Sequence, residues 1–146
     1  MDSLLLRVLV LAGLILVSVL VAVVLKRREG RVRQVSGGGT MTAADLGRPL
    51  GADATFVQFS TATCTPCRTV RRVLADHAEA TPGVVHVEVD AEERLDLARR
   101  HHVLRTPTVL VLDGGGRVGA RFSGVPTPHQ LRDAVPHRLP PRTPRR

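Results

Sequence analysis

A long apolar run near the amino terminus constrains this chain more than any other feature. Residues 4–25 are almost entirely Leu, Val, Ala and Ile, and Arg7 is the only charged residue among them. A helix rises about 1.5 Å per residue, so a run of this length can cross a hydrocarbon core of about 30 Å. We therefore expect a single transmembrane helix over residues 4–25, with the lipid bilayer as its partner.

A cleaved secretory signal is the alternative interpretation of the same run. The apolar core of a signal usually covers about 7–15 residues and ends at a cleavage site of small residues. Here the run is longer and passes directly into Lys26, Arg27 and Arg28. These features favour an uncleaved membrane anchor.

The formal net charge of +8 does not indicate a nucleic-acid partner. Many of the basic residues lie just after the apolar run or in the last nine residues, where they meet lipid head groups or solvent. The chain has no Trp, no Tyr and only three Phe, so it lacks aromatic platforms on which single-stranded bases stack. We expect no nucleic-acid binding.

The 146 residues leave room for one folded domain and its appendages. Residues 26–40 are basic and end in a run of glycines, which predicts a flexible linker. Residues 138–146 are basic and rich in proline, which predicts a disordered tail. The folded domain is therefore expected over residues 41–137.

Hydrophobic periodicity predicts the elements of this domain. Runs of β-branched and apolar residues predict strands, and apolar residues three or four apart predict helices. The strands and helices are expected, in chain order, over residues 54–60, 69–80, 84–90, 91–102, 108–112, 118–123 and 128–135, after a short helix capped by Thr42. The order β, α, β, α, β, β, α predicts an α/β domain with a mixed sheet. Its first two strands should be parallel, its last two should form an antiparallel hairpin, and helices should cover both faces.

Two cysteines, Cys64 and Cys67, carry the chemistry that the sequence indicates. They follow the first predicted strand and open the helix after it. A helix N-terminus has unpaired N–H groups and a partial positive charge, which favour the thiolate that attacks in disulfide exchange. Pro66 fits between them, because proline is tolerated in the first helical turn. We expect Cys64 to be the exposed attacking sulfur and Cys67 to resolve the mixed disulfide.

Two other interpretations of the cysteine pair stay open on the CxxC spacing alone. The pair can be half of a zinc site, although no second CxxC and no HxxxH is present. It can also be simple packing of two thiols in a helix. The further ligand candidates in the domain are His77, His86, His101 and His102. The position between a strand and a helix favours redox chemistry, for which we expect no metal and no organic cofactor.

A second motif, Thr106-Pro107-Thr108, lies between a predicted helix and a predicted strand. With Cys64-Thr65-Pro66-Cys67 it resembles the thioredoxin superfamily, whose members pair a CxPC motif with a cis-proline facing the cysteines. The resemblance covers residues 41–135 and implies a thioredoxin-like sandwich, preceded here by one transmembrane helix. It also implies that Pro107 belongs with the catalytic cysteines. The implied substrate groove comprises Thr65, Pro66, Thr106 and Gly124.

The resemblance implies a membrane-tethered thiol–disulfide oxidoreductase. Its partners would be protein disulfide or dithiol substrates and a membrane or cytosolic electron donor. The alternative is a thioredoxin-like binding module that holds a membrane partner and performs little exchange. An intact pair of cysteines favours the enzyme, because a pure adaptor would not need it.

Two positions depart from the family pattern. Thr63 stands before the first cysteine, where the family usually has Trp, and Gln58 stands six positions before it, where thioredoxins have a buried Asp. That acid resembles a proton acceptor for the resolving thiol, so its loss predicts kinetics unlike those of ordinary thioredoxins. His86 occupies a place where the family often has Lys, and it could titrate there or be a satisfied strand histidine.

Two arguments about topology conflict. Membrane-anchored thioredoxin-like proteins generally resemble extracytoplasmic enzymes. The distribution of charge indicates the opposite, because Arg7 is the only basic side chain near the start of the span and orientation follows the Lys/Arg bias at its ends. The basic residues directly after the span are Lys26, Arg27, Arg28, Arg31 and Arg33. We expect the domain on the cytoplasmic face, where a reducing compartment would favour a reductase.

Overall fold

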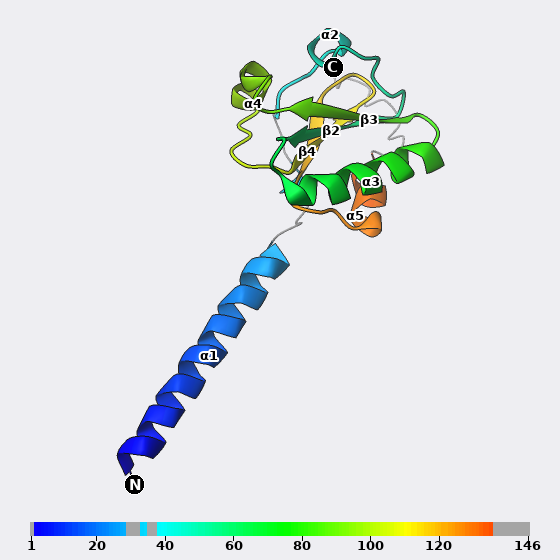
Figure 1. Ribbon diagram of the computed structural model, residues 1–146. Coiled ribbons are helices and arrows are strands. Elements are labelled where there is room, and N and C mark those ends of the chain that lie inside the picture. Colours follow the sequence, from blue (N-terminus) through cyan, green and yellow to red (C-terminus); the bar gives the residue numbers. More distant parts are fainter. Residues whose placement is uncertain (1, 29–32, 35–37, 136–146) are drawn as a thin grey trace, which may run out of the picture.

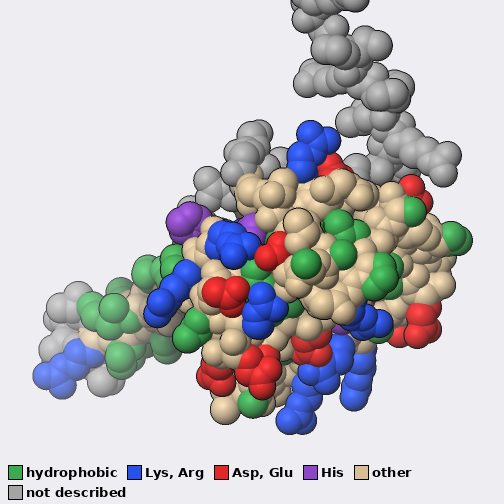
Figure 2. Space-filling model, turned by 90° about the horizontal axis from the view of Figure 1, so that it is seen from above, with side chains coloured by type: hydrophobic (Ala, Val, Ile, Leu, Met, Phe, Trp, Pro, Cys, Tyr) green, Lys and Arg blue, Asp and Glu red, His purple; other side chains and the backbone are tan. Residues whose placement is uncertain are grey.

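A computed structural model describes residues 2–28, 33–34 and 38–135 of the chain (Figure 1). The amino-terminal helix α1 (Asp2–Arg28) is longer at both ends than the predicted span. Within it, the stretch Arg7–Val24 is apolar and long enough to cross a membrane, a property that signal sequences share. The Leu, Val and Ile side chains between Val8 and Val24 are 43–71% exposed. In Figure 2 hydrophobic side chains are spread along the helix as it extends away from the domain.

The domain is built on a mixed sheet with the strand order β1-β5-β4-β2-β3. As predicted, the two strands joined through a helix are parallel and the hairpin is antiparallel, and β4 also pairs with β2 in antiparallel fashion. The two-residue strand β1 pairs with β5; it was not predicted and lies in the segment expected to be a linker. The strands are β1 (Arg33–Gln34), β2 (Ala54–Ser60), β3 (Val84–Asp90), β4 (Thr108–Asp113) and β5 (Val118–Ser123).

The helices that the structure describes in the domain are α2 (Ala43–Leu46), α3 (Thr65–Ala80), α4 (Leu95–Arg100) and α5 (Pro128–Ala134). In Figure 1, α3 and α5 lie on one face of the sheet, and α2 and α4 lie on the other. The core is divided accordingly. Successive residues of β2 alternate between the two halves, so that Phe56 packs with α3 and α5 while Val57 packs with α2 and α4. All seven residues of β2 are buried, as its continuous apolar run predicts.

The helix predicted over residues 91–102 is wrong in its extent. The carboxylate of Asp90 accepts hydrogen bonds from the backbone N–H groups of Glu92 and Glu93, at 2.8 and 3.3 Å, which forms a turn before α4 begins. At the other end, His102 has a φ of +50°, which ends the helix. The tail expected to be disordered, residues 138–146, lies outside the described residues.

The sheet brings the two motifs to one edge. Because β4 runs antiparallel to β2, the residues that precede β4 lie beside the residues that follow β2. The register pairs Phe59 near the end of β2 with Thr108 at the start of β4, and Thr108 with Ser123 at the end of β5. The CxxC turn, the loop before β4 and Gly124 therefore meet at this edge.

Candidate redox site

Cys64 and Cys67 are joined by a disulfide at the start of α3, with their Cα atoms 5.4 Å apart. Cys64 is the N-cap residue in extended conformation, and its carbonyl accepts a hydrogen bond from the N–H of Cys67 at 3.2 Å. Pro66 occupies the second helical position, where a backbone N–H would have no partner within the helix. Cys64 is half-buried, whereas Cys67 is only 2% exposed.

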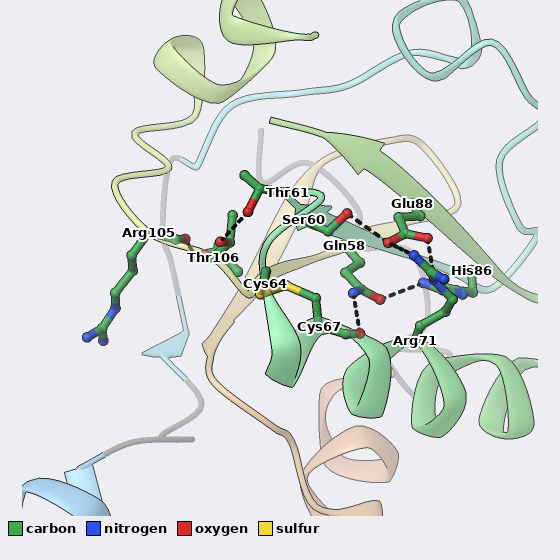
Figure 3. Close-up of a disulfide and its surroundings, with 11 residues drawn as sticks. Gln58, Ser60, Thr61, Cys64, Cys67, Arg71, His86, Glu88, Arg105 and Thr106 are labelled. Carbon is green, nitrogen blue, oxygen red and sulfur yellow. Dashed lines mark hydrogen bonds and ion pairs between the residues drawn. A yellow bond between two sulfur atoms is a disulfide. The ribbon is translucent and has the colours of Figure 1, made fainter. Parts of the chain in front are cut away.

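The loop before β4 faces the CxxC turn. The Thr106–Pro107 peptide bond is cis, as the resemblance implies. The Thr106 hydroxyl lies 3.5 Å from that of Thr61, which precedes the cysteines (Figure 3). Pro107 is buried, and its carbonyl accepts a hydrogen bond from the N–H of Gly124 at 3.1 Å. Gly124 has a φ of +91°, a conformation that favours glycine.

Two pockets open on this edge of the domain. One has a volume of about 430 Å³ and is lined by Pro66, Arg105, Thr106, Pro107, Ser123, Gly124 and Val125. The other has a volume of about 400 Å³ and includes both cysteines. Besides the cysteines, its lining comprises Ser60, Thr61, Ala62, Arg68, Arg71, Glu88, Asp90 and Glu93.

Six of the seven residues that the resemblance assigns to the site line one of these pockets: Cys64, Pro66, Cys67, Thr106, Pro107 and Gly124. The seventh, Thr65, is exposed and lines neither. The β2–β4 pairing and the Pro107–Gly124 hydrogen bond explain why segments so distant in sequence meet.

Gln58 lies fully buried beneath the first turn of α3. Its Nε2 donates a hydrogen bond to the carbonyl oxygen of Cys67 at 2.9 Å. Its Oε1 lies 3.2 Å from Nε2 of His86 on the neighbouring strand β3. Figure 3 shows the amide between the two. The residue that replaces the acid of the family pattern is therefore hydrogen-bonded at both ends of its side chain.

An ion pair lies beside this amide. Arg71 of α3 binds both carboxylate oxygens of Glu88 on β3, each at 2.6 Å, and the hydroxyl of Ser60 donates to Glu88 at 2.7 Å. Partial burial favours the neutral acid, but the hydrogen bonds from Arg71 and Ser60 outweigh it and lower the pKa of Glu88. The carboxylate is thus ionised and fully engaged at neutral pH.

The surroundings of His86 favour its neutral form. Burial lowers its pKa, the nearby carboxylate of Glu88 acts in the opposite direction, and Arg71 and Arg48 lower it further. Its ring is hydrogen-bonded to Gln58, which agrees with the interpretation as a satisfied strand histidine.

Sequence reasoning missed the Ser60–Glu88–Arg71 cluster. Two signals were present. Arg71 comes four residues after Cys67, which places the two on the same side of α3. Glu88 lies two residues after His86, so both side chains point to the same face of β3. Among the described residues, no three His, Cys, Asp or Glu side chains are grouped closely enough to hold a metal ion.

The arrangement can carry out thiol–disulfide exchange. Cys64 is half-buried and Cys67 is buried, so Cys64 is the cysteine that a thiolate from another molecule would attack. The groove beside Pro107 has both apolar and polar lining residues, and it can hold the substrate segment that carries the reacting cysteine. These are the parts that attack, resolution and substrate placement require.

Comparison with known proteins points the same way. The family model described as Thioredoxin matches residues 48–137. The chain is 35% identical over 70 residues to the thioredoxin H-type protein of Oryza sativa subsp. indica, a match covering 45% of this chain and 57% of that protein. It is 29% identical over 91 residues to a thioredoxin of Echinococcus granulosus, covering 62% and 80% respectively.

Solved structures give a similar result. A mutant thioredoxin from Halobacterium salinarum matches with a TM-score of 0.51 and 25% identity, covering 57% of this chain and 72% of that one. Fasciola hepatica thioredoxin matches with a TM-score of 0.50 and 27% identity, covering 58% and 80%. The chain spans about half the length of the first curated relatives that it matches.

Proposed function

The chain belongs to the thioredoxin family, and on that premise we propose that it is a membrane-tethered thiol–disulfide oxidoreductase that exchanges disulfides with protein substrates. The observation that carries the proposal is the Cys64–Cys67 disulfide at the start of α3, which joins one half-buried and one buried cysteine. A disulfide across so short a loop adds little stability. Its place at a helix N-terminus beside a groove gives it a chemical use instead.

The reaction proceeds in two steps. In the reduced enzyme the Cys64 thiolate attacks one sulfur of a substrate disulfide, a mixed disulfide forms, and the other substrate sulfur leaves as a thiolate. Cys67 then loses its proton and attacks the sulfur of Cys64, which releases the second substrate sulfur. The two substrate thiolates take up two protons, so the substrate disulfide is reduced and the enzyme dithiol is oxidised.

The groove formed by Pro66, Thr106, Pro107 and Gly124 holds the substrate segment next to the reacting sulfur. Pro107 is buried, and its carbonyl accepts a hydrogen bond from the N–H of Gly124, which makes this wall of the groove rigid. A rigid wall keeps the substrate sulfur in line with the attacking one, which raises the rate by orientation. Thr65 is exposed at the rim beside it.

Insulin reduction by the full chain in detergent, with dithiothreitol as electron source, tests the activity. We expect the unaltered chain to accelerate reduction well above the buffer rate and the Cys64→Ser variant to match the buffer. An unaltered chain that matches the buffer would reject the enzyme and leave the binding module. Stoichiometric zinc in elemental analysis would instead favour the metal-binding interpretation of the CxxC pair.

The anchor is the second part of the proposal. We assign residues 4–25 to a transmembrane helix and residues 41–137 to the thioredoxin-like domain, joined by residues 26–40 and followed by the basic tail at 138–146. The support is physical: burying one Leu or Val side chain contributes about 1.5–3 kcal/mol. The many such side chains exposed on α1 therefore favour insertion into lipid strongly.

The domain faces the cytoplasm in this proposal, because the Lys/Arg bias lies after the span. In the reducing cytoplasm, a membrane or cytosolic electron donor would return the two cysteines to their dithiol form after each turnover. The enzyme would then act as a reductase. A phosphatase fused after Arg146, of a kind that is active only when exported, tests the topology. Low activity is expected, and high activity would make the protein an extracytoplasmic thiol enzyme.

A further inference from the structure

Gln58 is held in one orientation by its two partners. A backbone carbonyl can only accept a hydrogen bond, so the group that faces the Cys67 carbonyl at 2.9 Å must be the NH₂ of the amide. The amide oxygen then faces His86 at 3.2 Å and can only accept. Nε2 of His86 must therefore carry a hydrogen, whether the imidazole is neutral or charged.

The charged groups around His86 leave this bond intact. Those groups are Glu88 on its own strand, Arg71 from α3 and Arg48 after α2. Glu88 already binds Arg71 through both of its oxygens and accepts from Ser60. The Nε2–H of His86 is thus directed at Gln58, and through it at the first turn of α3.

We propose that His86 is a positioning residue of the redox site: by donating to Gln58 it holds Cys67 in place for its attack on the mixed disulfide. This inference rests on the proposed exchange activity. The disulfide ties the two cysteines together only in the oxidised enzyme. In the mixed disulfide that tie is absent, and under this proposal the Gln58–Cys67 hydrogen bond seen in the oxidised enzyme is kept and anchors the turn to the sheet.

The proposal separates positioning from proton transfer. The amide of Gln58 does not titrate, and both its ends are engaged, so it takes no proton from Cys67. The proton that Cys67 loses is balanced by the proton that the departing substrate thiolate takes up. His86 donates to Gln58 in both of its protonation states, so the hydrogen bond that positions Cys67 should not depend on the titration of His86.

A single-turnover experiment on the reduced full chain in detergent tests this role. Dithiobis(nitrobenzoate), a small aromatic disulfide, releases one coloured thiolate when Cys64 attacks and a second when Cys67 attacks. The His86→Phe variant keeps a ring but cannot donate, whereas His86→Gln restores an NH₂ near the position of Nε2. The control is His129→Gln, because the side chain of His129 is 76% exposed on α5.

We expect the second release to slow about tenfold relative to the first in His86→Phe and to recover in His86→Gln, with the control unchanged. The pH profile of the second release should be the same in His86→Gln as in the unaltered chain. Equal slowing in both His86 variants, or slowing of both releases together, would overturn the positioning role. Absence of any release from the unaltered chain would reject the exchange activity itself, which is a different failure.

The tautomer of His86 can be measured in the unaltered chain, so this second test does not depend on the folding of any variant. The ¹⁵N shifts of His86 in the unaltered chain at neutral pH should report hydrogen on Nε2 and none on Nδ1. The opposite tautomer would mean that His86 does not donate to Gln58, and the proposal would then be wrong.

Discussion

Replacing Gln58 by glutamate should make the stability of the domain strongly dependent on pH. A protonated glutamate at position 58 can donate to the Cys67 carbonyl and accept from His86, as the amide does. An ionised one would set two acceptors face to face in a site that is 0% exposed. Full burial can raise the pKa of a glutamate by about 3–5 units from its usual value of about 4.3.

The sign and size of the effect follow from the proton count. Above about pH 4.3 the unfolded variant has released the proton at position 58, while the folded variant still holds it, either on the glutamate or shared with His86. The free energy of unfolding, compared with that of the unaltered chain, should therefore fall as the pH rises. One pH unit corresponds to about 1.36 kcal/mol, so the loss should grow by about 2.7 kcal/mol between about pH 5 and pH 7.

Urea unfolding of the full chain in detergent, followed by far-ultraviolet circular dichroism, measures this difference. The Gln58→Leu variant is the matched control, because it loses both hydrogen bonds but cannot titrate. Its free energy of unfolding should be about 1–3 kcal/mol lower than that of the unaltered chain. This difference should not vary with pH through position 58, because leucine does not titrate. A difference between Gln58→Glu and the unaltered chain that stays constant over this pH range would refute the reasoning, since it would mean that water or another group solvates the carboxylate.

Three further outcomes are expected. Cys64→Ser should abolish exchange and Cys67→Ser should accumulate a mixed disulfide visible by mass spectrometry, whereas normal turnover by Cys67→Ser would contradict the division of roles. In Cys67→Ser, ultraviolet absorbance should show Cys64 mainly as thiolate at about pH 7.5, because it caps α3; a neutral thiol there would speak against the helix effect. Burial lowers the pKa of His77, His86 and His101, so at mildly acidic pH the unfolded chain binds more protons than the folded chain. The free energy of unfolding should therefore decrease as the pH is lowered from about 6.5 to about 5. Urea titrations that give a constant free energy of unfolding over this range would contradict this expectation.

The strands could be predicted from the sequence because their side chains are of the kinds that sheets bury. The predicted bounds for β2, β3 and β5 agree with the structure, and β4 extends one residue further, to Asp113. Helix α4 could not be predicted in length, because the turn made by Asp90 has the same charged composition as a helix. Strand β1 has only two residues and no apolar pattern, so its pairing with β5 depends entirely on the folded sheet.

The cysteine pair and the loop before β4 could be recognised as motifs, but their surroundings could not. Gln58 and His86 are 28 residues apart, and they meet because β2 and β3 pair in the register that sets Gln58 beside Glu88. That register depends on how α3 packs across both strands, which no local pattern reveals. The contact between Arg71 and Glu88 could not be predicted either, because the two residues lie on α3 and β3, on either side of the turn that joins them.

The charge of the chain bears on how substrates reach the site. Within residues 34–137, eleven Arg residues are balanced by eleven Asp and Glu, so the net charge of +8 lies in residues 1–33 and 138–146, which include Arg33 of β1. The pocket beside the cysteines is itself mixed, because both Arg68 and Arg71 and the acids Glu88, Asp90 and Glu93 line it. With little net charge in residues 34–137, this part of the chain adds only a weak long-range force on a charged substrate. Under the proposed function, substrate selection would then depend mainly on short-range contacts in the groove, and the basic residues after the proposed span would bind anionic lipid head groups.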